Sequence, residues 1–167
     1  MKKRIFFDMD GVLAIWNTAA SIEETAEKGY FAKREKENRA VELVKMLVDC
    51  GYDVNILSSV YRDGHSANDK KEWLKTVGLS ELNRIFVPYG EKKREYIEKE
   101  ENEVCFLIDD FTKNLKEFEE GEGCYGIKFF NGINGTHGTW NGFAISNKMT
   151  PDRMFVTIRG IVDAIGN

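Results

Sequence analysis

Five short stretches of the chain are almost continuously apolar, and polar or turn-forming residues bound each of them. They are Ile5–Phe7, Val54–Leu57, Arg84–Val87, Val104–Ile108 and Tyr125–Phe130. Strands that are apolar throughout, rather than alternating with polar residues, are typical of a parallel sheet covered on both faces. The pattern therefore predicts a five-stranded parallel β-sheet.

Helical patterns lie between these strands. Residues Arg39–Cys50 and Asn68–Val77 each carry an apolar stripe at helical spacing and are followed by glycine. Residues Glu91–Glu100 and Thr112–Glu120 are highly charged and predict helices with solvated faces. The run Thr150–Asp152, a capping residue followed by proline, predicts the start of a last helix.

The order of these elements predicts the fold class. Strands that alternate with helices indicate right-handed βαβ units and a three-layer, Rossmann-like α/β fold. With 167 residues, the chain has the length of one domain, covering residues 1–167. Residues 14–38 interrupt the alternation and contain a short helical pattern, Ser21–Lys28, so we expect a small cap inserted after the first strand. Residues Asn131–Gly142 are rich in glycine and asparagine and predict a tight loop or a hairpin.

Acidic, hydroxyl and basic residues follow four of the predicted strands. The carboxyl ends of parallel strands meet at one edge of the sheet, where ligands bind in such folds, so we expect these side chains to converge. They are Asp8 and Asp10 after the first strand, Ser58 and Ser59 after the second, Lys92 and Lys93 after the third, and Asp109, Asp110 and Asn114 after the fourth.

Four carboxylates in one place repel one another. Two unit charges 4 Å apart repel by about 4 kcal/mol at an effective dielectric constant of 20. Such a cluster is tolerated only if a cation neutralises it or if some carboxylates stay protonated. A site made of carboxylate oxygens suits Mg²⁺. We therefore expect a Mg²⁺ site formed by Asp8, Asp10, Asp109 and Asp110.

The same residues suit the transfer of a phosphoryl group. Asp8 can attack phosphorus to form an aspartyl-phosphate. Asp10 can protonate the leaving group and later activate water. The metal, Lys93 and the hydroxyl of Ser58 can hold the phosphoryl oxygens.

The order, spacing and strand context of these residues resemble the four motifs of the haloacid-dehalogenase superfamily. The matching residues are Asp8-x-Asp10-x-Val12, Ser58, Lys93 and Asp109-Asp110-x-x-x-Asn114. The resemblance implies a Mg²⁺-dependent enzyme in which Asp8 is the nucleophile and a metal ligand. It further implies that Asp10 is the acid and base, with its backbone carbonyl on the metal.

The remaining motif residues take roles from the same resemblance. It implies that Ser58 binds phosphate with help from Ser59, and that Asp110 is the acidic metal ligand with Asp109 beside it. The run Lys93–Ile97 favours Lys93 over Lys92 as the lysine of the phosphate site. Asn114 is expected to orient Lys93 or a water molecule. An aspartate two residues after the nucleophile is typical of the phosphatase and phosphomutase branches.

The run Asp8–Ala14 is also similar to the start of the 5′(3′)-deoxyribonucleotidases. In that family an aromatic residue eight positions after the nucleophile lines the base pocket, which corresponds here to Trp16. An aromatic ring is a suitable platform for stacking a base. The resemblance therefore implies a (deoxy)nucleoside monophosphate as substrate, with Trp16 in contact with the base.

Composition narrows the function classes. The formal net charge is −4, with Lys and Glu interspersed along the polar stretches, which argues against a nucleic-acid-binding protein. Cys50, Cys105 and Cys124 show neither a disulfide framework nor zinc spacing. No apolar run has the length of a membrane span, and Asp8 interrupts the only stretch that resembles a signal peptide. We therefore expect a reduced, cytoplasmic protein that acts on a small phosphorylated substrate.

Three functions are compatible with the sequence. The first is a Mg²⁺-dependent phosphomonoester hydrolase that resembles the nucleotidases and is expected to act on a nucleotide. The second is a phosphomutase or phosphotransferase that uses the same aspartyl-phosphate, or a phosphatase of another small metabolite such as a sugar phosphate. The third is a non-catalytic binding module, which is disfavoured because Asp8, Asp10, Lys93 and Asp110 are all present. We predict the first.

Overall fold

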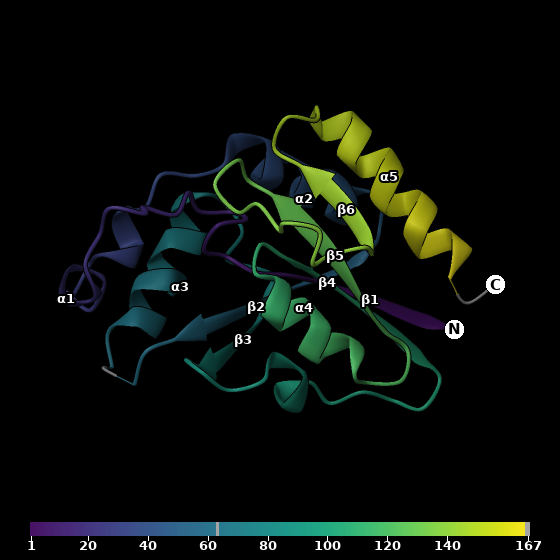
Figure 1. Cartoon of the computed structure of the whole chain (residues 1–167), viewed down its shortest axis with the longest axis horizontal. Coiled ribbons are helices and arrows are strands. Elements are labelled where there is room, and N and C mark those ends of the chain that lie inside the picture. The colour runs from purple at the N-terminus through teal and green to yellow at the C-terminus, as the bar shows by residue number, and fades with distance from the viewer. Residues whose placement is uncertain (63, 166–167) are drawn as a thin grey trace.

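The computed structural model describes residues 1–62 and 64–165, and a parallel β-sheet between two helical layers dominates it (Figure 1). The sheet order is β3-β2-β1-β4-β5-β6. The predicted three-layer, Rossmann-like α/β architecture is therefore confirmed. The strands are β1 (Lys2–Phe7), β2 (Asp53–Val60), β3 (Asn83–Pro88), β4 (Glu103–Asp109), β5 (Cys124–Phe130) and β6 (Phe143–Ser146).

Helices cover both faces of the sheet. Helices α2, α3 and α5 pack on one face, and α4 packs on the other with the single turn η2. No helix in the described part of the chain is long and apolar enough to cross a membrane. The elements are α1 (Ile22–Thr25), η1 (Phe31–Lys33), α2 (Asn38–Asp49), α3 (Ser66–Thr76), η2 (Lys93–Tyr96), α4 (Thr112–Glu119) and α5 (Pro151–Ala164).

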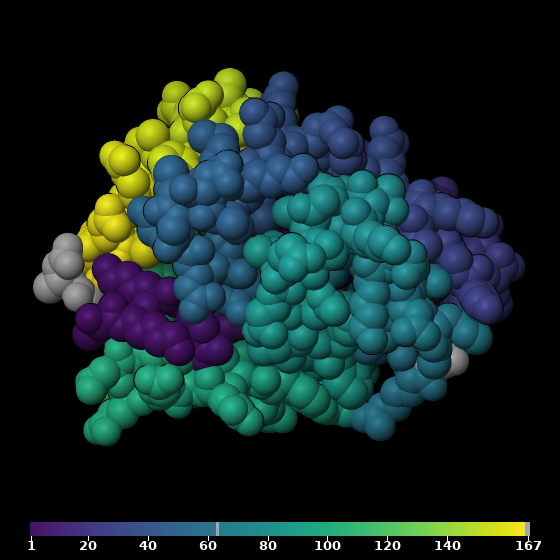
Figure 2. Space-filling model, turned by 180° about the vertical axis from the view of Figure 1, so that it is seen from behind, coloured from purple at the N-terminus to yellow at the C-terminus, as the bar shows by residue number. Residues whose placement is uncertain are grey.

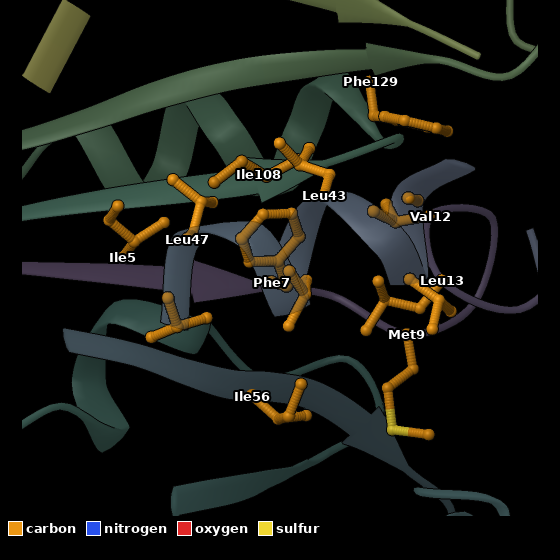
Figure 3. Close-up of a cluster of buried hydrophobic side chains, with 14 of the residues drawn as sticks. Ile5, Phe7, Met9, Val12, Leu13, Leu43, Leu47, Ile56, Ile108 and Phe129 are labelled. Carbon is orange, nitrogen blue, oxygen red and sulfur yellow. The ribbon is translucent and has the colours of Figure 1, made fainter. Parts of the chain in front are cut away.

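The larger core lies between the sheet and helices α2, α3 and α5. Ile5 and Phe7 of β1 point to this face, and Figure 3 shows Phe7 among side chains of α2 and the neighbouring strands. Leu43 and Leu47 of α2 are fully buried there. Burial of each such side chain stabilises the fold by about 1.5–3 kcal/mol. The end of β1, where the acidic residues begin, is therefore held rigidly.

A sixth strand corrects the prediction of five. Strand β6 pairs in parallel with β5, so Asn131–Gly142 is a crossover loop and the hairpin alternative is wrong. The run Phe143–Ser146 is only four residues long and has a single buried side chain, Ile145. So short a run carries too little apolar periodicity to be recognised as a strand.

The helix predicted over Glu91–Glu100 is also wrong, because only the 3₁₀ turn η2 forms there. This run has no apolar stripe, and packing against the core is what stabilises most helices in proteins. Ile97 is its one buried apolar side chain. The turn instead directs Lys93 into the interior, where it is almost fully buried.

The insertion between β1 and α2 is closed at its base. Ala14 and Lys36 form an antiparallel bridge there. Its helix, α1, ends at Thr25 and is shorter than the predicted helix over Ser21–Lys28. In the space-filling view the insertion, in blue-purple, lies at one end of the molecule beside α3 (Figure 2). In Figure 1 this end lies opposite the N-terminus.

Candidate active site

The carboxyl ends of β1 and β4 bring the acidic residues together. Phe7 is in register with Ile108, and the backbone amide of Asp8 donates to the carbonyl oxygen of Ile108 at 3.0 Å. Asp8 therefore lies beside Asp109. Carboxylate oxygens of Asp8, Asp109 and Asp110 lie within 4.8 Å of one another. Three of the four acidic residues expected in one cluster therefore lie together, and Asp10 is not among them.

Lys93 enters this acidic cluster from η2. Its ammonium nitrogen lies 3.0 Å from Asp8 Oδ1 and 2.6 Å from Asp109 Oδ2. Burial works to lower the pKa of Lys93, but the charges of Asp109 and Asp8 outweigh it and raise the pKa, so Lys93 is a cation. Lys92 lies at the surface, where it pairs with Glu120 at 2.7 Å. Of the two lysines, the geometry selects Lys93.

Asp109 is bonded on both carboxylate oxygens. Its Oδ2 accepts from Lys93 and, at 3.0 Å, from Asn114 Nδ2, while Oδ1 accepts from the backbone amide of Phe111 at 2.8 Å. The side chain is fully buried. Asp109 is therefore the buried member of the cluster that orients Lys93. Asn114 bonds the same carboxylate oxygen and so acts on Lys93 through Asp109.

Asp110 is held by residues outside the predicted motifs. Asn131 Nδ2 donates to Asp110 Oδ2 at 3.1 Å and to the carbonyl oxygen of Gly11 at 2.9 Å. Gly11 has a φ of +79°, and a Cβ at this position would lie 2.1 Å from Asp110 Oδ2, so only glycine fits. Lys128, in register with Asp109, donates to the carbonyl oxygen of Asp110.

The negative charge of the acidic cluster exceeds the positive charge of the lysines around it. Burial, followed by the charges of Asp109 and Asp8, raises the pKa of Asp110 to about 8. Lys93 neutralises only part of this charge. A set of carboxylate oxygens short of positive charge fits a small, hard divalent cation. Asp8 and Asp110 are the two members of the cluster that also line the adjoining cavity.

A second buried lysine, Lys70 of α3, holds Asp10. Its ammonium donates to Asp10 Oδ2 at 2.5 Å, to Ser58 Oγ at 2.9 Å and to the carbonyl oxygen of Ser59 at 2.6 Å. Burial raises the pKa of Asp10, and the charge of Lys70 opposes this rise. Asp10 is thus held by Lys70 and is not one of the three carboxylates that lie within 4.8 Å of one another, although it lines the same cavity.

The two serines after β2 differ in exposure. Ser58 is fully buried and accepts a hydrogen bond from Lys70, which also holds Asp10, whereas Ser59 lines the cavity. Of the two, Ser59 is the residue that a ligand in the cavity can contact.

A cavity of about 260 Å³ opens over these groups. Trp16, expected to bind substrate, forms part of its wall. No lysine, arginine or histidine is among the described residues that line it. The lining consists of Asp8, Asp10, Asp110, Asn114, Ser59 and Val60, with the aromatic side chains of Trp16, Phe31, Tyr61, Tyr89 and Phe111.

Three important residues escaped prediction, although each left a trace in the sequence. Lys70 lies three and four residues before Trp73 and Leu74, on the stripe that is buried. Lys128 is a charged residue within the otherwise apolar run of β5. Asn131 directly follows β5, the one predicted strand whose end we had not included in the site.

Fold and site together describe a Rossmann-like α/β protein with an acidic centre at the carboxyl edge of its sheet. No protein-family model and no curated protein matches the chain. Among solved structures it is similar to D,D-heptose 1,7-bisphosphate phosphatase from Burkholderia thailandensis, with 12% identity and a TM-score of 0.60 over 95% of this chain and 99% of that chain. The corresponding phosphatase from B. bronchiseptica, complexed with magnesium and phosphate, has 12% identity and a TM-score of 0.64 over 96% of this chain and 99% of that chain. At this identity the likeness shows a shared fold.

Proposed function

We propose that this protein is a Mg²⁺-dependent phosphomonoester hydrolase of the haloacid-dehalogenase type, with Asp8 as its nucleophile. The observation that carries the proposal is the meeting of Asp8 and Asp110 at one cavity, with the buried Lys93 paired to Asp8 at 3.0 Å. The fold supports it, because two phosphatases share that fold. A nucleophile, an acidic metal site and a cation for the phosphoryl oxygens are the parts that phosphoryl transfer needs.

The carboxylates of Asp8 and Asp110 would hold Mg²⁺, with the backbone carbonyl of Asp10 as a further ligand. The ion, when bound, would neutralise negative charge on the phosphoryl group and on the cluster. Magnesium and phosphate are present together in one of the similar phosphatases, which supports this choice of metal. Asp109 remains behind the site, paired with Lys93.

In the first half of the reaction a carboxylate oxygen of Asp8 forms a bond to phosphorus. The bond from phosphorus to the ester oxygen breaks, and its electron pair goes to that oxygen. Asp10, protonated at this stage, transfers its proton to the departing oxygen, so the alcohol leaves neutral. Lys93, paired with Asp8, would offset the negative charge of the phosphoryl group, and Ser59, which lines the cavity, would bind a phosphoryl oxygen.

In the second half water removes the phosphoryl group. The carboxylate of Asp10 takes a proton from water as the water oxygen forms a bond to phosphorus. The bond from phosphorus to Asp8 breaks and returns its electron pair to the carboxylate. Inorganic phosphate leaves, and Asp10 is protonated for the next cycle.

The substrate is a small monophosphate ester, for which two leaving groups have support. The aromatic wall formed by Trp16, Phe31, Tyr61, Tyr89 and Phe111 favours a flat ring such as a nucleoside base. The shared fold with heptose bisphosphate phosphatases favours a sugar phosphate. In either case the described lining offers a second phosphate group no cationic partner, so we expect monophosphates to be preferred over bisphosphates.

The insertion at residues 14–38 acts as the cap in this proposal. It supplies Trp16 and Phe31 to the cavity wall. Trp73 Nε1 of α3 donates to the carbonyl oxygen of Arg34 at 2.7 Å, and Asp69 accepts from the amide of Gly29 at 2.7 Å. These contacts attach the insertion to the domain that carries the acidic residues.

A phosphate-release assay tests the function. The protein with Mg²⁺ is incubated with sugar phosphates, nucleoside monophosphates and phospho-amino acids, and inorganic phosphate is measured. We expect release that stops on chelation and returns when Mg²⁺ is added. Turnover that survives exhaustive chelation would contradict the proposal, and transfer of phosphate to a second substrate without release would indicate a phosphotransferase.

The variant Trp16→Ala separates the two substrate classes. If a base stacks on Trp16, kcat/KM falls by about tenfold for nucleoside monophosphates, which corresponds to about 1.4 kcal/mol, and changes less for sugar phosphates. An equal fall for both classes would remove the stacking role. Tyr96→Ala, on an exposed aromatic residue outside the cavity lining, provides the control.

A further inference from the structure

Three buried lysines lie at this site, and the mechanism above uses only Lys93. Lys128 supports the backbone of Asp110, which leaves Lys70 without an assigned part. Lys93 contacts Asp8 and Asp109, the acidic cluster that captures phosphorus. Lys70 comes from the opposite layer of helices and binds Asp10, the acid and base. Lys70 has no place in the four motifs that the sequence matches.

The ammonium group of Lys70 has no donor left for a substrate. An ammonium carries three N–H donors, and Lys70 has three acceptors: Asp10 Oδ2, Ser58 Oγ and the carbonyl oxygen of Ser59. Its side chain is 1% exposed and is not part of the cavity lining. Lys70 therefore acts on other residues of the chain, tying the loop after β1 to the end of β2.

This tie determines which oxygen of Asp10 is available. Oδ2 is held by Lys70, so Oδ1 is the oxygen that can exchange a proton with a ligand. The side chain of Asp10 is 22% exposed and lines the cavity. An orientation that is set before the substrate arrives lowers the barrier to proton transfer, because no rotation has to be frozen during the reaction.

The insertion closes over this pair. The ammonium of Lys70 lies 4.9 Å from the centre of the Phe31 ring, within the range of a cation–π contact. Phe31 also lines the cavity. One aromatic ring of the insertion thus contacts Lys70 and also lines the cavity that Asp10 borders.

We propose that Lys70 is a positioning residue that orients Asp10 for proton transfer to the leaving group and from water, and that it has no part in the attack of Asp8 on phosphorus. The proposal rests on the function proposed above. It assigns Lys93 and Lys70 to different tasks, Lys93 to the phosphoryl group and Lys70 to the two proton transfers. A lysine that only maintains the fold would slow every step to the same degree.

The need for a proton donor differs between substrates, and this difference provides the test. The p-nitrophenolate group leaves without protonation, so its departure does not require Asp10. An alkyl phosphate has a poor leaving group that does. Hydrolysis of the aspartyl-phosphate requires Asp10 with either substrate, because water must lose a proton.

Rapid-mixing kinetics on Lys70→Met, with Mg²⁺ present, should separate these steps. With p-nitrophenyl phosphate we expect a first turnover within about threefold of the parent rate, followed by accumulation of phosphoenzyme that is seen as a mass increase of the intact protein. With glycerol phosphate we expect the first turnover to slow by about 100-fold, within the range that general acid–base catalysis contributes. Asp10→Asn should reproduce this pattern, and Lys70→Arg should restore part of the lost rate.

Equal slowing of the first turnover with both substrates, without phosphoenzyme, would overturn the proposal, and so would unchanged kinetics. Asp8→Asn is the control for the proposed function, since it should form no phosphoenzyme with either substrate; if it does, that function fails whatever Lys70 does. If Lys70→Met does not fold, the double variant with Asp10→Asn removes both buried charges. The double variant should then match Asp10→Asn alone, and a further loss would contradict the proposal.

Discussion

Buried acidic side chains at the two edges of the sheet have pKa values shifted in opposite directions. At the amino edge, the buried Glu103 lies 2.6 Å from Arg4 and 3.3 Å from Lys2. Burial opposes ionisation of Glu103, but the hydrogen bonds from Arg4, the amide of Glu100 and Lys2 outweigh it and lower the pKa. At the carboxyl edge, burial and neighbouring charges raise the pKa of Asp110 to about 8.

This difference distinguishes charged groups that stabilise the fold from charged groups that are suited to bind a cationic ligand. Glu103 finds its partners within the chain, so its ionised form favours the folded state. Asp8 and Asp109 share Lys93, and Asp110 lies beside them with a pKa that Lys93 and Lys128 do not bring back to its usual range. An excess of buried acid costs stability unless a cation joins it, which is typical of functional sites.

The largest expected effect is the loss of turnover when Asp8, at the carboxyl edge, is replaced. Asp8→Asn removes the proposed nucleophile, so kcat should fall by roughly four orders of magnitude or more, as with nucleophiles of other covalent enzymes. The same change removes one of the repelling charges, so the melting temperature of the metal-free protein should stay equal or rise. Phosphate release and thermal unfolding measure the two effects.

Asp49→Asn, at an exposed position of α2, is the control for Asp8→Asn and should leave turnover unchanged. Retained turnover in Asp8→Asn would remove the nucleophile assignment. A marked loss of stability in that variant would instead show that the charge of Asp8 is offset by partners within the chain, as the charge of Glu103 is at the amino edge.

The amino edge should show the reverse behaviour. Glu103→Gln leaves Arg4 with a neutral partner, and we expect the free energy of unfolding to fall by about 2 kcal/mol while kcat is retained. Glu100→Gln is the matched control, because Glu100 also pairs with Lys2 but its side chain is 76% exposed. The control should change the free energy of unfolding by about 0.5 kcal/mol or less. If denaturant unfolding shows equal losses for both variants, the claim that the buried Glu103 stabilises the fold through its ion pairs is contradicted.

A smaller effect is expected where Asn131 supports Asp110. Asn131→Ala removes the amide that donates to Asp110 Oδ2, and we expect Mg²⁺ affinity to fall by about tenfold, as for other residues that orient metal ligands. Calorimetric titration with Mg²⁺ measures this change. Asn102→Ala, at an exposed position before β4, should bind as the parent does. Unchanged affinity in Asn131→Ala would place the metal away from Asp110.

The smallest effect concerns pH. The pKa of Asp110 is raised to about 8 in the metal-free protein, so at pH 7 its carboxyl is mostly protonated and Mg²⁺ must displace the proton. Affinity should therefore rise with pH, by about fivefold between pH 7 and pH 8, and level off above the pKa. Titrations in two buffers of different ionisation enthalpy would also detect the released proton. Affinity that is constant over this range would contradict the raised pKa.

The sheet could be predicted because its strands are buried on both faces and read as continuous apolar runs. The alternation with helices then determined the parallel topology, and with it the meeting of Asp8 and Asp110 at one edge. Strand β6 and the chain around η2 could not be predicted in the same way. Both depend on contacts with elements distant in the sequence, and neither has a periodic pattern of its own.

Within the site, the acidic residues at the ends of β1 and β4 were predictable, whereas Lys70, which reaches the site from the side of a helix, was not. Lys70 lies in a charged stretch of α3 that also has the appearance of a solvated helix face. Only the packing of α3 beside the loop after β1 turns this lysine inward. The difference between Ser58 and Ser59 has a similar cause, since one residue of register decides which of them lines the cavity.

Trapping the covalent intermediate tests the central claim most directly. The protein is mixed with Mg²⁺ and p-nitrophenyl phosphate, quenched in acid, reduced with borohydride and analysed by peptide mass spectrometry. An aspartyl-phosphate is converted by this treatment to homoserine, which we expect at position 8 and which should be absent in Asp8→Asn. Phosphate release by a protein that never carries the modification at Asp8, or that carries it at another residue, would contradict the account.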